Sequence, residues 1–260
     1  MSYLEEIFSL KGKRVLLTGG HGLYGSQITL ALCKAGASVI IASRSVEKNK
    51  ALVEELTAKG YDITCEAYDQ GDEASIIALG EKIKATGGLD VLINNSVLRI
   101  MKGYHDSAEN FSKSLEVNGT GLFLMHRVFG DMMAEKGNGS IINIGSYMGI
   151  LGADDTLYRN VSFSGFNSPD YFFHKGGMTN LTRFMASKYG PQGVRVNVLE
   201  LGGLLRDQDQ IFVERYNDRT FLKRMANDTD LMGIIILLAS DASSYITGAV
   251  IPVDGGYSAK

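Results

Sequence analysis

Short runs of aliphatic residues alternate with longer segments of helical periodicity along nearly the whole chain. Several of the short runs, among them VLL (15–17), VIIA (39–42) and VLI (91–93), are apolar at consecutive rather than alternate positions. Strands of this kind are buried on both faces, which is typical of parallel sheets covered by helices. The pattern therefore predicts a doubly wound α/β fold with right-handed crossovers.

The alternation predicts seven strands and six helices in turn. The predicted strands are Arg14–Thr18, Ser38–Ser43, Asp62–Tyr68, Val91–Asn94, Ser140–Gly145, Val194–Glu200 and Ala249–Val253. The predicted helices are Tyr24–Lys34, Val46–Lys59, Glu73–Thr86, Ala108–Glu135, Tyr171–Tyr189 and Asp230–Ser240. Because no linker or repeat interrupts them, we expect a single Rossmann domain over residues 1–260, a three-layer sandwich around a seven-stranded parallel sheet.

Two stretches break this rhythm. Residues 150–168 are polar and contain glycine without a clear period, and residues 202–220 are polar and charged. Both follow predicted strands, and ligands of a doubly wound sheet bind at the carboxyl ends of the strands. We therefore predict an inserted loop at 150–168 and a substrate loop at 202–220.

Composition and charge argue against several classes of protein. The chain holds 31 glycines but only three prolines, which suits a regular fold whose turns need positive φ or close backbone approach. A net charge of −3 provides no basic field for nucleic acid. The apolar run at 233–239 is too short to cross a membrane, and Glu5 and Glu6 do not suit a signal peptide. We expect a cytoplasmic protein without a metal site, in which Cys33 and Cys65 are free thiols.

A glycine-rich turn joins the first strand to the first helix. In TGGHGLYG (18–25), Gly19, Gly22 and Gly25 allow a tight turn, backbone approach to a pyrophosphate and close packing of helix on strand. The helix N-terminus offers free N–H groups to phosphates. The turn predicts a dinucleotide site, the alternative being an ordinary βα connection.

The end of the second strand indicates which dinucleotide binds. A carboxylate there would bind the ribose 2′-hydroxyl of NAD, but the strand ends in Ser43 and Arg44. A guanidinium pairs with a phosphate dianion, and Ser43 offers a hydroxyl donor. NADP(H) is favoured, NAD(H) stays possible, and Arg44 could instead be a solvated surface charge.

Tyr171 and Lys175 in YFFHK share one face of a predicted helix at i,i+4 spacing. The pKa of a phenol is about 10, and a neighbouring ammonium lowers it towards the working range of an acid/base catalyst. The pair alone occurs easily by chance, but here it opens a helix directly after a long loop.

Together these motifs give the chain a resemblance to the classical short-chain dehydrogenases/reductases from Lys11 to Tyr257. The motifs that carry it are TGGHGLYG (18–25), INNSV (93–97), EVNGTG (116–121), INIGS (142–146), YFFHK (171–175), RVNVLELGG (195–203) and ITGAVIPVDGG (246–256). The departures are Leu23 and Val97 in place of glycine, Ser96 in place of alanine and Leu201 in place of proline. None of them removes a catalytic group.

The resemblance implies a catalytic set of Asn118, Ser146, Tyr171 and Lys175. Tyr171 would exchange the proton at the carbinol oxygen, and Ser146 would hydrogen-bond that oxygen. Lys175 would hold the nicotinamide ribose and lower the pKa of Tyr171, while Asn118 would bind a water that links Lys175 to solvent. Asn118 and Ser146 could alternatively have only local structural roles. The expected cofactor-binding residues are Gly19, Gly22, Leu23, Tyr24, Gly25, Ser43, Arg44, Asp69, Gln70, Asn95, Tyr171, Lys175 and Gly202.

Tyr171 follows Ser146 by 25 positions, a longer spacing than is usual in the family. The insertion offers polar groups suited to a polyhydroxylated or charged substrate, although it could be a solvated excursion. These groups are Asp154, Asp155, Arg159, Asn160 and Asn167. We expect Ser146, Arg99 and Arg159 to contact substrate. The insertion and SYMG (146–149) are similar to members grouped with flagellin-modification and acidic-sugar pathways.

The predicted function is an NADP(H)-dependent oxidoreductase that interconverts a secondary alcohol and a ketone on a small, carbohydrate-like substrate. Two alternatives stay open, a 3-oxoacyl-type ketoreductase and a non-catalytic NADP-binding regulator. The resemblance also implies a homotetramer or homodimer with the helices 108–135 and 171–189 at one interface. Both helices could instead be merely buried against the sheet.

Overall fold

The computed structural model describes residues 2–161 and 168–260. Seven parallel strands form one sheet in the order β3-β2-β1-β4-β5-β6-β7, which confirms the predicted fold class. The strands are β1 (Arg14–Thr18), β2 (Ser38–Ser43), β3 (Ile63–Ala67), β4 (Val91–Asn94), β5 (Gly139–Ile144), β6 (Val194–Leu201) and β7 (Val250–Val253). The strand order reverses between β1 and β4, and this switch point opens a crevice at the carboxyl ends of the strands.

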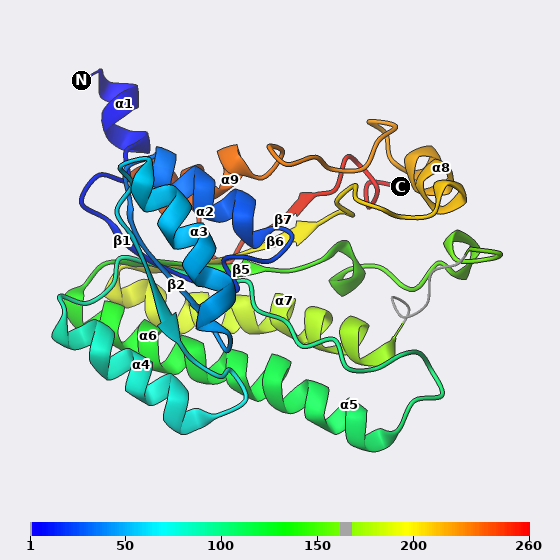
Figure 1. The fold of residues 1–260 in the computed structure, drawn as a ribbon, viewed down its shortest axis with the longest axis horizontal. Coiled ribbons are helices and arrows are strands. Elements are labelled where there is room, and N and C mark those ends of the chain that lie inside the picture. The colour runs from blue at the N-terminus through cyan, green and yellow to red at the C-terminus, as the bar shows by residue number, and fades with distance from the viewer. Residues whose placement is uncertain (1, 162–167) are drawn as a thin grey trace.

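Helices cover both faces of the sheet (Figure 1). The helices are α1 (Tyr3–Phe8), α2 (Gly25–Lys34), α3 (Val46–Ala58), α4 (Glu73–Ala85), α5 (Ala108–Leu115), α6 (Leu122–Lys136), α7 (Pro169–Tyr189), α8 (Gln210–Arg219) and α9 (Met232–Ala239). Consecutive residues of β1 serve opposite layers: Val15 and Leu17 pack with Ile28 of α2, whereas Leu16 packs with Phe129 of α6. Inner strands such as β1 and β4 therefore need apolar residues at consecutive positions, as their sequences have.

The predicted helix at 108–135 is interrupted. A π-helical segment, Glu116–Gly121, separates α5 from α6. The side chain of Asn118 lies in it, accepting a hydrogen bond from the Leu98 N–H and donating one to the Leu98 carbonyl, each at 2.8 Å. A Cβ on Gly121 would lie 2.1 Å from the Gln70 carbonyl, so glycine is required there. Apolar periodicity does not reveal such a π-bulge, which depends on these contacts with other segments.

The predicted loop at 202–220 contains a helix, which corrects that part of the prediction. The Asp209 carboxylate caps α8 by accepting the Ile211 N–H at 2.9 Å, and Phe212 and Tyr216 bury one narrow face. The rest of α8 is polar, so the apolar periodicity of this segment is too weak to predict a helix. A short 3₁₀ turn, Tyr147–Gly149, directly precedes the insertion and a second, Asp155–Leu157, lies within it, while Asn167 lies outside the described residues.

Both cysteines are free thiols, as expected: Cys33 is buried on α2 and Cys65 is half-buried on β3. Within the described ranges, every helix is too short or too polar to span a bilayer.

Candidate active site

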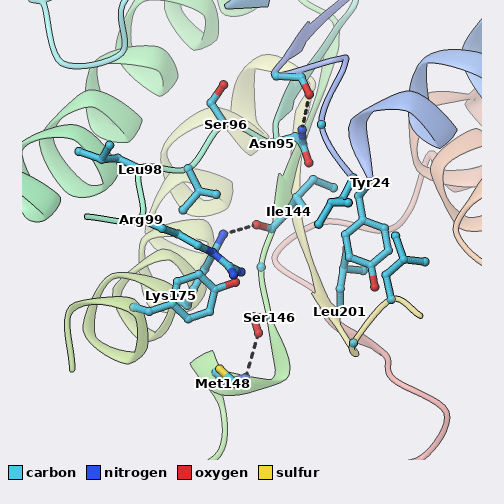
Figure 2. A pocket seen from close by; sticks show the side chains of 18 of the residues that line it. Tyr24, Asn95, Ser96, Leu98, Arg99, Ile144, Ser146, Met148, Lys175 and Leu201 are labelled. Carbon is cyan, nitrogen blue, oxygen red and sulfur yellow. Dashed lines mark hydrogen bonds between the residues drawn. The ribbon is translucent and has the colours of Figure 1, made fainter. Parts of the chain in front are cut away.

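A pocket of about 580 Å³ opens where the carboxyl ends of β1, β2, β4, β5 and β6 meet (Figure 2). Most of the residues predicted from the sequence to bind cofactor or substrate line it. They are Gly19, Gly22, Leu23, Tyr24, Ser43, Arg44, Asp69, Gln70, Asn95, Arg99, Ser146, Tyr171, Lys175 and Gly202. Gly25, Asn118 and Arg159 are not among the lining residues.

The glycine-rich turn has the backbone that a phosphate cradle needs. Gly19 has φ +68°, a left-handed conformation that glycine adopts without strain. A Cβ on Gly25 would lie 2.0 Å from the Gly19 carbonyl, so Gly25 serves the close packing of α2 on the turn rather than the pocket wall. The Asn95 amide donates to the carbonyls of Thr18 and Gly19 at 3.0 Å each, which fixes the turn against β4 (Figure 2). The turn therefore fits a dinucleotide pyrophosphate.

Three basic side chains line the pocket near the end of β2. Arg44 directly follows β2, Lys48 lies in the first turn of α3, and both are exposed. His21 of the glycine turn lines the same pocket. Lys48 was not predicted from the sequence. Ser43 also lines the pocket, and its hydroxyl donates to the Ser45 carbonyl at 3.1 Å and accepts from Asn49 at 3.0 Å.

Asp69 and Gln70 line the pocket after β3. The Asp69 carboxylate accepts the Gly71 N–H at 2.9 Å, which holds the chain in a turn. The Gln70 side chain accepts from the Tyr68 hydroxyl at 2.9 Å and donates to the Val117 carbonyl at 3.0 Å. These contacts order the pocket wall that follows β3, where the sequence predicts cofactor-binding residues.

Ser146, Tyr171 and Lys175 meet at the bottom of the pocket. Ser146 follows β5, and the other two residues lie one turn apart on α7. The Lys175 ammonium donates to the Ile144 carbonyl at 2.6 Å (Figure 2), and Ser146 hydrogen-bonds the Tyr171 phenol. The geometry brings a phenol, an ammonium and a hydroxyl together as expected.

The charges around Tyr171 favour its phenolate. Burial alone would raise the pKa of the phenol, but the positive charges of Lys175 and Arg99 and the hydrogen bond with Ser146 outweigh it, so the pKa falls below its usual value. Burial lowers the pKa of Lys175, an effect that the negative phenolate of Tyr171 opposes. The pair can therefore exchange a proton nearer to neutral pH than free phenol could.

Arg99 lies beside Tyr171, with the guanidinium carbon 4.6 Å from the centroid of the phenol ring. Figure 2 shows its side chain extending beside Lys175. Lys102 and His105, which also follow β4, are exposed and absent from the pocket lining. Of these three candidate rim charges, the structure places only Arg99 at the site.

Asn118 is buried, and its amide is bonded to Leu98 and to Ser114, at 3.0 Å from the Ser114 hydroxyl. It ties the π-helical segment to the strand extension that carries Arg99. His174, on α7, packs edge-on against the Tyr171 ring at 5.1 Å, and burial lowers its pKa to about 3. A histidine so hard to protonate suits a packing role rather than that of a second acid/base.

The insertion contributes one aromatic side chain, Tyr158, to the pocket. The same apolar wall is completed by residues from outside the insertion, namely Tyr147, Met148, Phe212, Tyr216 and Met225. Asp154 instead pairs with Arg219 of α8 at 2.6 Å, and Arg159 is exposed with its carbonyl bound by Arg215. The structure does not bring Arg159 to the substrate site, because its segment docks on α8 through backbone contacts.

The described part of the chain contains no cluster of His, Cys, Asp and Glu side chains that could hold a metal ion. The pocket residues offer instead backbone N–H groups, hydroxyls and cations, which are the donor set of a dinucleotide site.

A family profile described as enoyl-(acyl carrier protein) reductase matches residues 24–258. The chain belongs to the short-chain dehydrogenase/reductase family. It is 30% identical to the 2-dehydro-3-deoxy-D-gluconate 5-dehydrogenase of Bacillus subtilis, with 99% of each chain covered. This short-chain dehydrogenase/reductase is an NAD(P)-dependent oxidoreductase that acts on CH–OH groups.

Two solved structures illustrate the likeness. A gluconate 5-dehydrogenase from Burkholderia cenocepacia, in complex with NADP and tartrate, is 25% identical with a TM-score of 0.90, covering 99% of this chain and 100% of its own. A short-chain dehydrogenase from Leptospira borgpetersenii with bound NAD+ is 28% identical with a TM-score of 0.85, covering 99% and 96%. The family therefore uses either dinucleotide on this fold.

Proposed function

We propose that this enzyme interconverts the secondary alcohol and the ketone of a small carbohydrate-like acid, with NADP(H) as its cofactor. The observation that carries the proposal is the position of Arg99, whose guanidinium lines the pocket against the Tyr171 ring. A guanidinium there can bind a carboxylate of the substrate in a bidentate pair while the reacting carbon faces Tyr171.

In this proposal Tyr171 exchanges a proton with the reacting oxygen of the substrate. The phenolate accepts the hydroxyl proton during oxidation, and the phenol returns it during reduction. Ser146 donates a hydrogen bond to the same oxygen, and Lys175 lowers the pKa of Tyr171. Asn118 fixes the Leu98 segment and, as the family resemblance implies, orders a water next to Lys175. The dinucleotide supplies the hydride chemistry when bound.

The basic end of the pocket supports NADP(H) over NAD(H). Arg44, Lys48 and His21 line the region that follows β2, where the ribose 2′-position of a bound dinucleotide lies in this fold. Two exposed cations and an imidazole favour a 2′-phosphate. Asp69 and Asn95 are proposed to contact the adenine and the turn as the sequence implied.

The aromatic wall fits the apolar C–H face of a sugar, and its methionines would also accept an acyl chain. The alternative of a 3-oxoacyl ketoreductase is supported by this wall, but an acyl chain offers no carboxylate to the Arg99 guanidinium. The relative that acts on a deoxy-gluconate derivative supports the sugar-acid assignment.

We also propose that the enzyme assembles into a homotetramer or homodimer through α5, α6 and α7. Phe123 on α6 is 40% exposed, and Phe173 and Phe184 on α7 are each 62% exposed. Several exposed phenylalanines on neighbouring helices are typical of a surface that binds another protein chain. Light scattering of the purified protein tests this, and a monomer at micromolar concentration would contradict it.

The test of the proposed function is a paired substrate panel. Sugar acids and keto acids are compared with the corresponding neutral sugars and with 3-oxoacyl thioesters, using NADP(H) and NAD(H), by nicotinamide absorbance. The proposal expects turnover of acids with NADP(H). Turnover of long acyl ketones alone, or tight NADPH binding with no turnover of any compound, would support one of the two alternatives instead.

A further inference from the structure

A charged side chain lies fully buried beneath the proposed catalytic residues. Glu200 on β6 is 0% exposed, although it belongs to a residue type that is seldom buried. Burial raises the pKa of its carboxyl group above the usual value, and hydrogen bonds from Thr179 and Ser146 reduce that effect. A buried carboxylate costs stability unless its oxygens are well bonded, so its retention beneath an active site calls for a reason.

Both oxygens of Glu200 are engaged by elements of the site. Oε2 accepts the Ser146 N–H at 2.7 Å, and Oε1 accepts the Thr179 hydroxyl at 2.6 Å. A Cβ on Gly145 would lie only 2.5 Å from Oε2, so the chain can approach the carboxylate only because residue 145 is glycine. The carboxylate thus holds the turn that presents the Ser146 hydroxyl.

The same carboxylate acts on Lys175. The Lys175 ammonium donates to the carbonyl of Ile144, which directly precedes Gly145, and the Thr179 hydroxyl lies 3.1 Å from the Lys175 carbonyl. The negative charge of Glu200 raises the pKa of Lys175 and opposes the lowering by burial. Glu200 therefore connects β5 and α7 at the level of both functional groups.

We propose that Glu200 is a positioning residue of this active site, whose buried carboxylate fixes the Ser146 backbone, is bound to α7 through Thr179 and places a negative charge beneath the Ser146 and Lys175 pair. The inference rests on the proposed function, because the roles of Ser146 and Lys175 are assigned there. It extends that function to a side chain that touches neither substrate nor cofactor.

The decisive variant is Glu200→Gln, which keeps the shape of the side chain and removes its charge. The titration of Lys175 is followed by ¹³C NMR of its Cε, assigned by loss of the signal in Lys175→Arg. We expect its pKa to fall, since the supporting negative charge is gone. We also expect the alkaline limb of the kcat profile to move to lower pH, with NADPH affinity unchanged. An unaltered Lys175 titration would overturn the charge role.

Two valine variants on α7 test the positioning role independently of the charge. Thr179→Val removes the hydroxyl that binds Glu200, whereas Thr182→Val removes an equally buried hydroxyl that binds Asn143 at 2.8 Å. Both variants lose stability, but only Thr179→Val is expected to lose kcat, by roughly tenfold. Equal kcat values for the two variants would overturn the positioning role, even if Glu200→Gln failed to fold.

Failure of this inference is distinguishable from failure of the proposed function. The Lys175 titration needs no substrate, so it reports on Glu200 even if the substrate panel yields no turnover. Conversely, turnover of sugar acids together with an unaltered Lys175 titration and equal kcat values for the valine pair would uphold the function and reject Glu200 as a positioning residue.

Discussion

The guanidinium carbon of Arg99 lies 4.6 Å from the centroid of the Tyr171 ring, and both side chains line the same pocket. This pairing places a fixed positive charge next to the phenol that is proposed to exchange the substrate proton. It has two separable consequences, one for the substrate and one for the ionisation of Tyr171.

The first consequence concerns substrate charge. Arg99→Gln should raise KM for an acidic substrate by roughly 10- to 100-fold, because a charge-assisted pair is lost, and should change KM for the neutral analogue much less. Steady-state kinetics on a matched acid and neutral pair measures this. Lys102→Gln, which removes an exposed charge three residues away, is the control. An equal effect of Arg99→Gln on both substrates would contradict the carboxylate role.

The second consequence concerns pH. Oxidation requires the phenolate, so kcat/KM for oxidation should rise as pH passes through the lowered pKa of Tyr171, and the reduction rate should fall over the same range. Arg99→Gln removes one of the positive charges that lower this pKa, so its oxidation profile should move to higher pH. Profiles with the same midpoint would show that the Arg99 charge does not act on Tyr171.

Cofactor preference is predicted to depend on Arg44 and Lys48. Arg44→Ala should lower kcat/KM for NADP by roughly 10- to 100-fold and leave the value for NAD nearly unchanged, because only NADP carries the 2′-phosphate. Lys48→Ala should act in the same direction more weakly. Lys50→Ala, on the same helix but paired with Glu47 at 2.6 Å, serves as the control. A wild-type preference for NAD would refute the assignment.

A buried histidine predicts acid sensitivity of the fold. Burial lowers the pKa of His126 to about 4, while its Nδ1 donates to the Leu122 carbonyl at 2.9 Å and its Nε2 accepts from Asn143 at 3.1 Å. Because the unfolded chain binds the proton more tightly, the stability contributed by neutral His126 is complete above pH 6.5 and is lost as pH falls towards 4.

Urea denaturation at a series of pH values measures this loss, expected at about 3 kcal/mol of unfolding free energy over that range. His126→Leu should be less stable than wild type at neutral pH but show a flatter pH dependence. His105→Gln, at an exposed position, should follow the wild-type curve. Parallel curves for wild type and His126→Leu would contradict the origin of the effect.

Much of the fold follows from local pattern. The predicted bounds of β1, β2 and β4 agree with the structure, because strands buried on both faces have unbroken apolar runs ended by polar residues. The π-helical segment around Asn118 and the polar helix α8 could not be predicted from local pattern. Each depends on contacts with distant segments, such as Leu98 and the insertion.

The active-site residues divide in the same way, into those that local motifs predict and those that only contacts between distant segments reveal. The order of the motifs predicts Tyr171, Lys175 and Ser146, and the position after a strand end predicts Arg99. The structure places all four in the pocket lining. Arg159 does not line the pocket: Asp154 of the insertion pairs with Arg219 of α8, and Arg215 of α8 binds the Arg159 carbonyl, contacts that sequence spacing does not reveal. Glu200 was passed over because a single acid within an apolar strand has no motif, and its role appears only from its contacts with Ser146 and Thr179.

The most direct test of the account is single-turnover oxidation of a sugar acid by the NADP-loaded enzyme, compared between wild type and Tyr171→Phe. The account predicts that the variant binds NADPH with unchanged affinity but forms NADPH roughly a thousandfold more slowly, because no group accepts the hydroxyl proton. Oxidation at the wild-type rate in Tyr171→Phe would contradict the assignment of Tyr171 as the acid/base.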